Sequence, residues 1–84
     1  MGLDGVVLIE KVEDEFHISF TDDEAIKILT VGDFRDAIFR KIVPRAYTED
    51  YIYQRIRMIL VDEFAVPLEN IRPEARFVAD LGLD

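Results

Sequence analysis

The chain has 84 residues, 50% of them hydrophobic and 33% charged, which is the composition of one small globular domain and excludes a multidomain enzyme. Ten Lys and Arg residues against 18 Asp and Glu residues give a net charge of −8, so the chain as a whole repels nucleic acid. It has no Cys, no apolar run near the ~20 residues of a membrane span and no signal-peptide pattern, so we expect a cytoplasmic protein with no membrane partner.

The first part of the sequence predicts two helices joined by an extended connector. Apolar side chains recur at helical spacing over residues 4–15, with charged side chains between them. Residues 16–20 then alternate between apolar and polar, which we interpret as a connector that inserts alternate side chains into the core. Thr21 and Glu24 match a capping box and predict a short helix over about residues 22–28.

A third helix and a linker follow. Thr30 and Asp33 form a similar cap, which predicts a helix near residues 31–42. Pro44 ends this helix, because the residue before a proline is pushed out of helical geometry. Residues 44–48 then form a short linker that ends in a threonine cap.

The last part of the sequence predicts one long helix and one long loop. Residues 49–64 carry acidic side chains in the first turn and an apolar stripe along one side, as in a helix packed on a core. Residues 65–84 contain Pro67, Pro73 and Gly82, which are typical of a loop. Apolar residues recur within this loop, so we expect it to pack across the helices rather than extend into solvent.

No set of side chains predicts catalysis or metal binding. His17 is the only histidine, so a histidine-based triad or metal site lacks its parts, and we interpret His17 as a surface residue. The acidic residues do not follow the spacing of a calcium loop, and the scattered glycines form no phosphate-binding loop. Tyr47, Tyr51 and Tyr53 are expected to pack the junction next to the linker. We therefore do not expect an enzyme.

The loop and the helix before it resemble the acyl carrier protein family. In that family a first helix leads through a long loop to Asp-Ser-Leu at the start of a second helix. The matching segments here are Ile52 to Phe64, Ala65-Val66-Pro67, Glu69-Asn70-Ile71, Pro73-Glu74-Ala75-Arg76-Phe77-Val78 and Asp80-Leu81-Gly82-Leu83-Asp84. What the family places after the serine stands instead at the other end of this chain, in Leu3-Asp4, Leu8 to Phe16, Asp22-Asp23-Glu24-Ala25 to Ile28 and Thr30-Val31-Gly32-Asp33-Phe34.

The resemblance implies a circular permutation. Residues 1–43 resemble the C-terminal half of the family, residues 49–84 resemble its N-terminal half, and residues 44–48 join the two. We therefore expect a single domain with an all-α fold: a small acyl-carrier-like four-helix bundle of three longer helices and one short one. The new chain ends open at the place where the family carries its prosthetic group.

The resemblance also places the cofactor site. The family attaches phosphopantetheine to the serine that follows an aspartate; here Asp84 stands at the aspartate position, Gly2 at the serine position and Leu3 after it. Gly2 has no hydroxyl, so phosphopantetheine is expected for the family but is not attachable to this chain. Ser19 lies in the apolar connector and is not expected to replace the missing serine. The permutation requires Asp84 and Gly2 to be neighbours in space.

Partner recognition in the family uses acidic residues on the second helix, and residues 1–24 here hold eight acidic side chains against one base, Lys11. Asp4, Glu13 and Asp14 match acidic family positions, whereas Val7 stands where the family usually has a glutamate. The resemblance implies binding to basic surfaces of acyl-chain-processing enzymes and of phosphopantetheinyl transferase. Read without it, the acidic side chains form an ordinary solvated surface.

Two functions remain open from the sequence. The first, by resemblance, is an acyl-carrier-like scaffold for acyl intermediates of fatty-acid or polyketide-type biosynthesis, whose aliphatic core also serves as a cargo pocket. The residues expected to form this core are Leu8, Ile9, Val12, Ile28, Ile38, Ile59, Leu60, Phe64 and Phe77. The second is an interaction module that docks a basic partner through its acidic helix and never carries a prosthetic group. We expect a monomer, with a domain-swapped dimer as the alternative because the linker is short.

Overall fold

Helices form all the regular structure of the computed structural model, which describes residues 2–42 and 46–84. Over these residues the chain is all-α, as expected, and contains no strand, only an isolated bridge between Thr30 and Arg76. The elements are α1 (Leu3–Phe16), α2 (Asp22–Ala25), α3 (Val31–Lys41), α4 (Glu49–Phe64) and a short 3-10 turn, η1 (Leu68–Asn70). No helix in the described part of the chain is long and apolar enough to cross a membrane.

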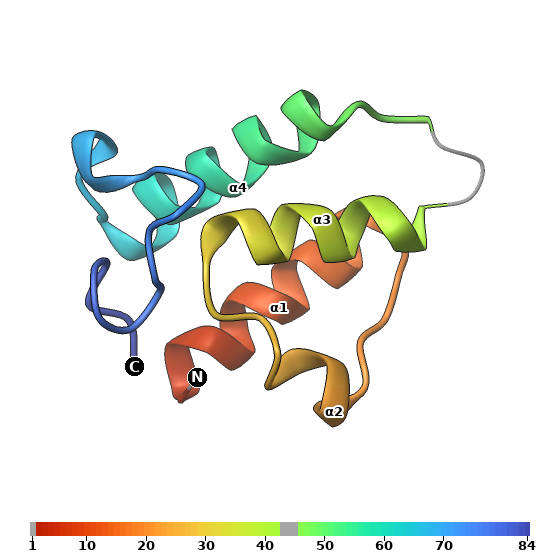
Figure 1. Cartoon of the computed structure of the whole chain (residues 1–84), viewed down its shortest axis with the longest axis horizontal. Helices are drawn as coiled ribbons and strands as arrows, with labels where there is room; N and C mark the ends of the chain where they lie inside the picture. Colours follow the sequence, from red (N-terminus) through yellow and green to blue (C-terminus); the bar gives the residue numbers. More distant parts are fainter. Residues whose placement is uncertain (1, 43–45) are drawn as a thin grey trace.

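α3 and α4 run antiparallel and pack side by side, with α1 against α4 and the small α2 beside them (Figure 1). The segment after α4, drawn in blue, covers the end of the molecule where α3 begins (Figure 1). Both chain ends lie at this same end. The predicted stop at Pro44 falls within residues 43–45, outside the described residues.

The predicted caps start the helices. Thr21 and Glu24 form a complete capping box at α2, and Thr30 and Asp33 form another at α3. The side chain of Thr48 accepts a hydrogen bond from a backbone N–H in the first turn of α4. Capping residues next to apolar stripes therefore predicted the starts of these three helices.

α2 is shorter than predicted, because it ends at Ala25 rather than near residue 28. The N–H groups of Lys27 and Ile28 donate to carbonyl groups only three residues earlier, which tightens the chain into a turn. This turn buries Ile28 and leaves Ile26 exposed. Burial of Ile28 decides the boundary, and helical spacing alone does not show it.

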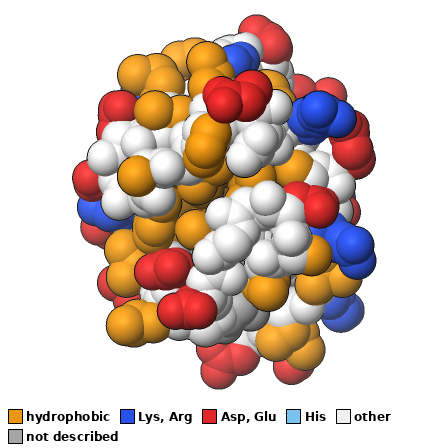
Figure 2. Space-filling model, turned by 90° about the vertical axis from the view of Figure 1, so that its left-hand side faces the viewer, with side chains coloured by type: hydrophobic (Ala, Val, Ile, Leu, Met, Phe, Trp, Pro, Cys, Tyr) orange, Lys and Arg blue, Asp and Glu red, His pale blue; other side chains and the backbone are white. Residues whose placement is uncertain are grey.

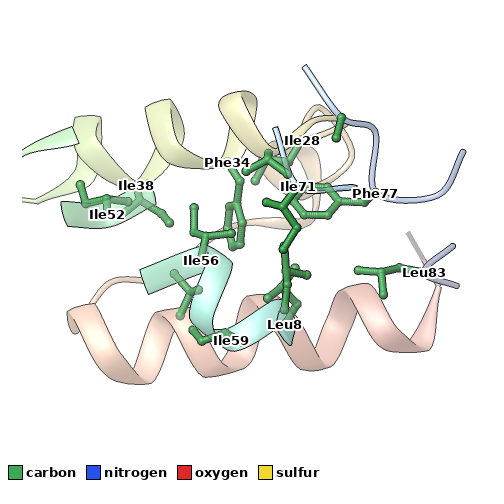
Figure 3. Close-up of a cluster of buried hydrophobic side chains, with 14 of the residues drawn as sticks. Leu8, Ile28, Phe34, Ile38, Ile52, Ile56, Ile59, Ile71, Phe77 and Leu83 are labelled. Atoms are coloured by element: carbon green, nitrogen blue, oxygen red, sulfur yellow. The ribbon is translucent and has the colours of Figure 1, made fainter. Parts of the chain in front are cut away.

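The core lies between α1, α3, α4 and the C-terminal loop, and Figure 3 shows its side chains pointing toward one another. Of the predicted core residues, Ile9 and Phe64 are only partly buried. The buried core consists of Leu8, Val12, Phe16, Ile28, Val31, Phe34, Ile38, Ile42, Ile52, Ile56, Ile59, Leu60, Val66, Ile71, Ala75, Phe77 and Leu83.

The connector after α1 behaves as predicted. His17 ends α1 in a left-handed conformation and is exposed, so its assignment as a surface residue is confirmed. Ile18 and Phe20 pack against the core, and the Phe20 ring lies 6.0 Å from that of Phe34. The tyrosine cluster is only partly as expected, because Tyr47 stacks on Tyr51 whereas Tyr53 donates a hydrogen bond to the carbonyl of Ile71, away from the junction.

The long loop is tied to the first turn of α3. The N–H of Val31 donates to the carbonyl of Ala75 at 3.0 Å, and that of Gly32 donates to the carbonyl of Pro73 at 2.7 Å. A Cβ atom at Gly32 would lie 2.9 Å from the Pro73 oxygen, so this close approach requires glycine. The loop thus satisfies backbone donors that a helix start leaves free.

Candidate functional site

The start of α1 and the last residue of the chain meet at one place, as the sequence predicted. A Cβ atom built on Gly2 would lie 2.9 Å from the carbonyl carbon of Asp84. The backbone of the two residues is therefore in contact although they are at opposite ends of the sequence. The prediction that Asp84 and Gly2 are neighbours is confirmed.

The helical hydrogen-bond pattern of α1 continues across the break. The N–H of Val6 donates to the carbonyl of Gly2 at 3.1 Å, four residues earlier, and the N–H of Gly5 donates to the carbonyl of Asp84 at 3.3 Å. If Asp84 directly preceded Gly2, the second bond would also join residues four apart. Asp84 thus occupies the position that the residue before Gly2 holds in an unbroken helix.

Asp84 also makes a hydrogen bond that resembles half of a capping box. Its N–H donates to Oδ2 of Asp4 at 3.2 Å. Counted across the break, Asp4 is three residues after Asp84, which is the spacing by which Asp33 accepts the N–H of Thr30 at the start of α3. Gly2 is the N-cap residue of α1, with φ −85° and ψ −142°, and Asp84 lies directly before it in space.

Free donors remain at this helix start. The side chain of Gly2 cannot cap, and no described residue accepts a hydrogen bond from the N–H of Leu3 or Asp4. Leu3 itself is 74% exposed. Unsatisfied N–H groups at the positive end of a helix favour an anion, but the side chains of Asp4 and Asp84 already place negative charge at this helix start.

A folded turn holds Asp84 in place. The N–H of Arg76 donates to Oδ2 of Asp80 at 2.7 Å, and the N–H of Leu83 donates to the carbonyl of Phe77 at 2.9 Å. Gly82 has a positive φ of 73°, a conformation that glycine adopts without strain. Leu83 is buried and lies beside α1 (Figure 3), so it anchors the residue next to Asp84.

A hollow of about 200 Å³ opens between α1 and α2 close to this helix start. Its lining is mainly apolar and consists of Gly5, Val6, Ile9, Asp22, Ala25 and Ile26. On the end of the molecule that carries the loop and both chain ends, apolar side chains also line a central hollow, with acidic groups around it (Figure 2). The predicted core residues Leu8, Val12 and Leu60, by contrast, are fully buried in the packed interior.

The four residues predicted to contact partners do not form one acidic surface. Val7 and Asp14 are exposed on the outer face of α1, together with Glu10, which the sequence did not single out. The carboxylate of Asp4 accepts the N–H of Asp84, and that of Glu13 accepts the N–H of Phe20 at 2.7 Å. Asp4 and Glu13 are half-buried and serve local structure, which a charge pattern alone does not indicate.

An ion pair ties α1 to α4. Nε and Nη2 of Arg55 donate to the two carboxylate oxygens of Glu15, both at 2.6 Å. These hydrogen bonds raise the pKa of Arg55 above its ordinary value. Among the described residues, no group of three or more His, Cys, Asp or Glu side chains could hold a metal ion.

No protein-family model matches the chain, and no solved structure matches it significantly.

Proposed function

We propose that the chain is an acyl-carrier-like scaffold in circularly permuted order, built to hold acyl intermediates on phosphopantetheine in fatty-acid or polyketide-type biosynthesis, with its attachment position interrupted. The proposal rests on the resemblance of the sequence segments to the acyl carrier family. It is supported by one observation above all. The carbonyl of Asp84 accepts the N–H of Gly5 as if Asp84 directly preceded Gly2.

The residues at this site do not fit a covalently attached phosphopantetheine. Attachment needs a side-chain hydroxyl after Asp84, and Gly2 has none. A side chain at Gly2 would also meet the backbone of Asp84 at 2.9 Å. In this proposal the chain keeps the helix start and the hollow between α1 and α2 but lacks the bond-forming group, and it performs no chemistry itself.

The second candidate is an interaction module without a prosthetic group, which docks a basic partner through α1. Exposed Glu10 and Asp14, which lie beside exposed Val7, favour it. No described residue pairs with either of these carboxylates at salt-bridge distance. Exposed carboxylates attract a basic surface at long range, and their contribution weakens with added salt.

The test restores the family order. A rejoined chain would run from Ala46 to Asp84, continue through a serine in place of Gly2, and then run from Leu3 to Arg45. Incubation with a phosphopantetheinyl transferase and coenzyme A should add one phosphopantetheine, read by intact mass. The same rejoined chain with alanine at that position, and the chain in its present order, should gain no mass.

Two results would contradict the carrier proposal. One is a rejoined serine chain that has native helical content by circular dichroism but gains no mass. The other is a mass gain on the chain in its present order, which would move the attachment site to Ser19 or to a threonine. Salt-sensitive binding of a basic partner by the unmodified chain would then favour the interaction module.

A further inference from the structure

The outer face of α4 carries apolar side chains that the fold does not bury. Tyr51, Met58 and Val61 are 45%, 50% and 36% exposed. They lie on the side of α4 opposite the buried Ile52 and Ile56, and α4 forms the upper edge of the molecule in Figure 1. A helix with a buried stripe on one side needs no second apolar stripe on the other for its own packing.

The spacing of this second stripe is that of a helix–helix contact. Its positions, which alternate between steps of three and four residues, are Tyr51, Gln54, Met58, Val61 and Ala65. Leu68, 51% exposed, lies next to it. Gln54, Met58, Val61 and Leu68, with Arg57 and Asp62, surround a hollow of about 290 Å³ that an apolar side chain of another helix can enter.

The charged side chains beside the stripe are complementary to the same side chains in a second copy of the chain. Arg55 and Asp62 lie on the same flank of the stripe, seven residues apart. In an antiparallel pair of α4 helices related by a two-fold axis, each flank faces the same flank of the other copy. When Met58 lies opposite Val61 of the second copy, Arg55 lies within two residues of Asp62 of the second copy along the helix axis, and this happens twice.

Arg55 is oriented for this contact. Glu15 occupies its Nε and Nη2 edge, whereas Nη1 points along the exposed face toward the sulfur of Met58 at 3.5 Å. Asp62 makes no salt bridge to another described residue. A guanidinium whose Nη1 makes only a weak hydrogen bond to sulfur and a carboxylate without a salt bridge thus lie on the same flank of the apolar stripe.

From the apolar stripe and its complementary charges we propose that the outer face of α4 binds a second copy of this chain in an antiparallel dimer. The two-fold axis of this dimer crosses α4 at the level of Ile59 and Leu60. The interface is small, so the dimer is reversible and forms at chain concentrations on the order of 0.1 mM. The proposal does not depend on a carrier function, since it uses residues of α4 and none of the exposed residues Val7, Glu10 and Asp14 of α1. It also differs from domain swapping, because each copy keeps its own fold.

Sedimentation equilibrium over a range of concentrations tests the dimer. The unmodified chain should move from monomer to dimer, and Met58→Glu should raise the dissociation constant about tenfold or more, because a charge replaces a buried apolar group at the centre. Ile26→Glu, which changes an exposed apolar residue on another face, should leave the dissociation constant unchanged. A chain that stays monomeric at millimolar concentration, or a dimer that Met58→Glu does not weaken, overturns the proposal.

Disulfide cross-linking tests the register of the two helices. Because the chain has no native Cys, a disulfide can form only between the introduced residues. A Met58→Cys chain mixed with a Val61→Cys chain should give a disulfide-linked heterodimer faster than either chain alone gives a homodimer. If the two α4 helices packed in parallel, the Met58→Cys and Val61→Cys homodimers would form faster than the heterodimer. If the dimer were domain-swapped, none of these disulfides would be favoured. Either of these patterns overturns the antiparallel dimer.

Discussion

The first turns of α1 and α3 contain similar polar groups but differ in how many of their backbone N–H groups have an acceptor. At α3, Thr30 and Asp33 form a complete capping box, and the carbonyl groups of Pro73 and Ala75 accept the next backbone donors. At α1, the N-cap is Gly2, the N–H of Asp84 donates to the side chain of Asp4, and the N–H groups of Leu3 and Asp4 have no acceptor among the described residues.

The difference separates a structural helix start from one that is available for binding. A helix start with all its donors satisfied has nothing left to offer a ligand, whereas free donors keep their attraction for an anion. The middle of the long loop supplies acceptors for the backbone donors at the start of α3. The end of the same loop leaves two donors at the start of α1 without an acceptor. We expect substitutions at the closed site to reduce stability more than equivalent substitutions at the open one.

The largest effect should come from releasing the loop. Phe77 is fully buried, packs edge-on against Phe34 at 5.9 Å, and donates its N–H to the carbonyl of Leu29. Phe77→Ala should lower the free energy of unfolding by about 3–5 kcal/mol, measured by chemical denaturation. Val78→Ala, at an exposed neighbour, is the matched control and should change it by less than about 0.5 kcal/mol. Equal losses in the two variants would show that the loop is not anchored through Phe77.

The two glycines at the helix starts give the sharpest contrast. A Cβ atom would meet a backbone atom at 2.9 Å at both Gly2 and Gly32. Gly32→Ala should lower the free energy of unfolding by about 1–3 kcal/mol, because Pro73 is held by a 2.7 Å hydrogen bond and has little room to move. Gly2→Ala should have a smaller effect, because Gly2 and Asp84 are both exposed, whereas Gly32 is buried. The comparison fails if Gly2→Ala is the more destabilising of the two in thermal melts.

Asp33 and Asp4 lie in the first turns of α3 and α1. We expect the substitution at α3 to lower the free energy of unfolding more than the substitution at α1. Asp33 accepts hydrogen bonds from two backbone N–H groups, those of Leu29 and Thr30, whereas Asp4 accepts one, that of Asp84. Asp33→Ala should lower the free energy of unfolding by about 1 kcal/mol and Asp4→Ala by about half of that. Urea titrations of the two variants side by side would check this order, and a reversed order would mean that the α1 start is the more tightly closed.

A smaller effect, on the pH dependence of stability, is expected at α2, which is part of neither of the two helix starts compared above. A hydrogen bond from Lys41, with the backbone N–H of Thr21, lowers the pKa of Glu24 below its ordinary value of 4.5. A carboxyl whose pKa is lower in the folded state stabilises the fold above its unfolded pKa, and this stabilisation is lost as the pH falls through the folded pKa. Melting temperatures should therefore fall less steeply below about pH 4.5 in Glu24→Gln than in the unmodified chain. Parallel acid curves for the two chains would contradict this.

Most of the fold could be predicted from the sequence, because threonine caps and apolar spacing are local signals. The starts of α2, α3 and α4 follow directly from Thr21, Thr30 and Thr48. The end of α2 could not be predicted, since it depends on the burial of Ile28 against distant elements. The loop was expected to pack on the helices, but its hydrogen bonds to the first turn of α3 join residues more than 40 positions apart and have no local signature.

The candidate site was predicted unevenly. The contact between Asp84 and Gly2 followed from matching sequence segments, because that match fixes which residues must adjoin. The engagement of Asp4 and Glu13 with backbone N–H groups was missed, since a carboxylate that caps a turn looks the same in sequence as one that faces solvent. The unburied stripe on α4 was missed too, because the buried stripe of the same helix already explained its apolar residues.

The central claim is that the chain break interrupts one continuous structure, with Asp84 directly before Gly2. Head-to-tail closure of the chain after removal of Met1, with a peptide bond from Asp84 to Gly2, tests it without changing any helix or the loop. The closed chain should keep the native circular dichroism spectrum and gain roughly 2–4 kcal/mol in the free energy of unfolding, as expected for a link that closes a long loop without strain. A closed chain that is no more stable than the open one, or that loses helix, would contradict the account.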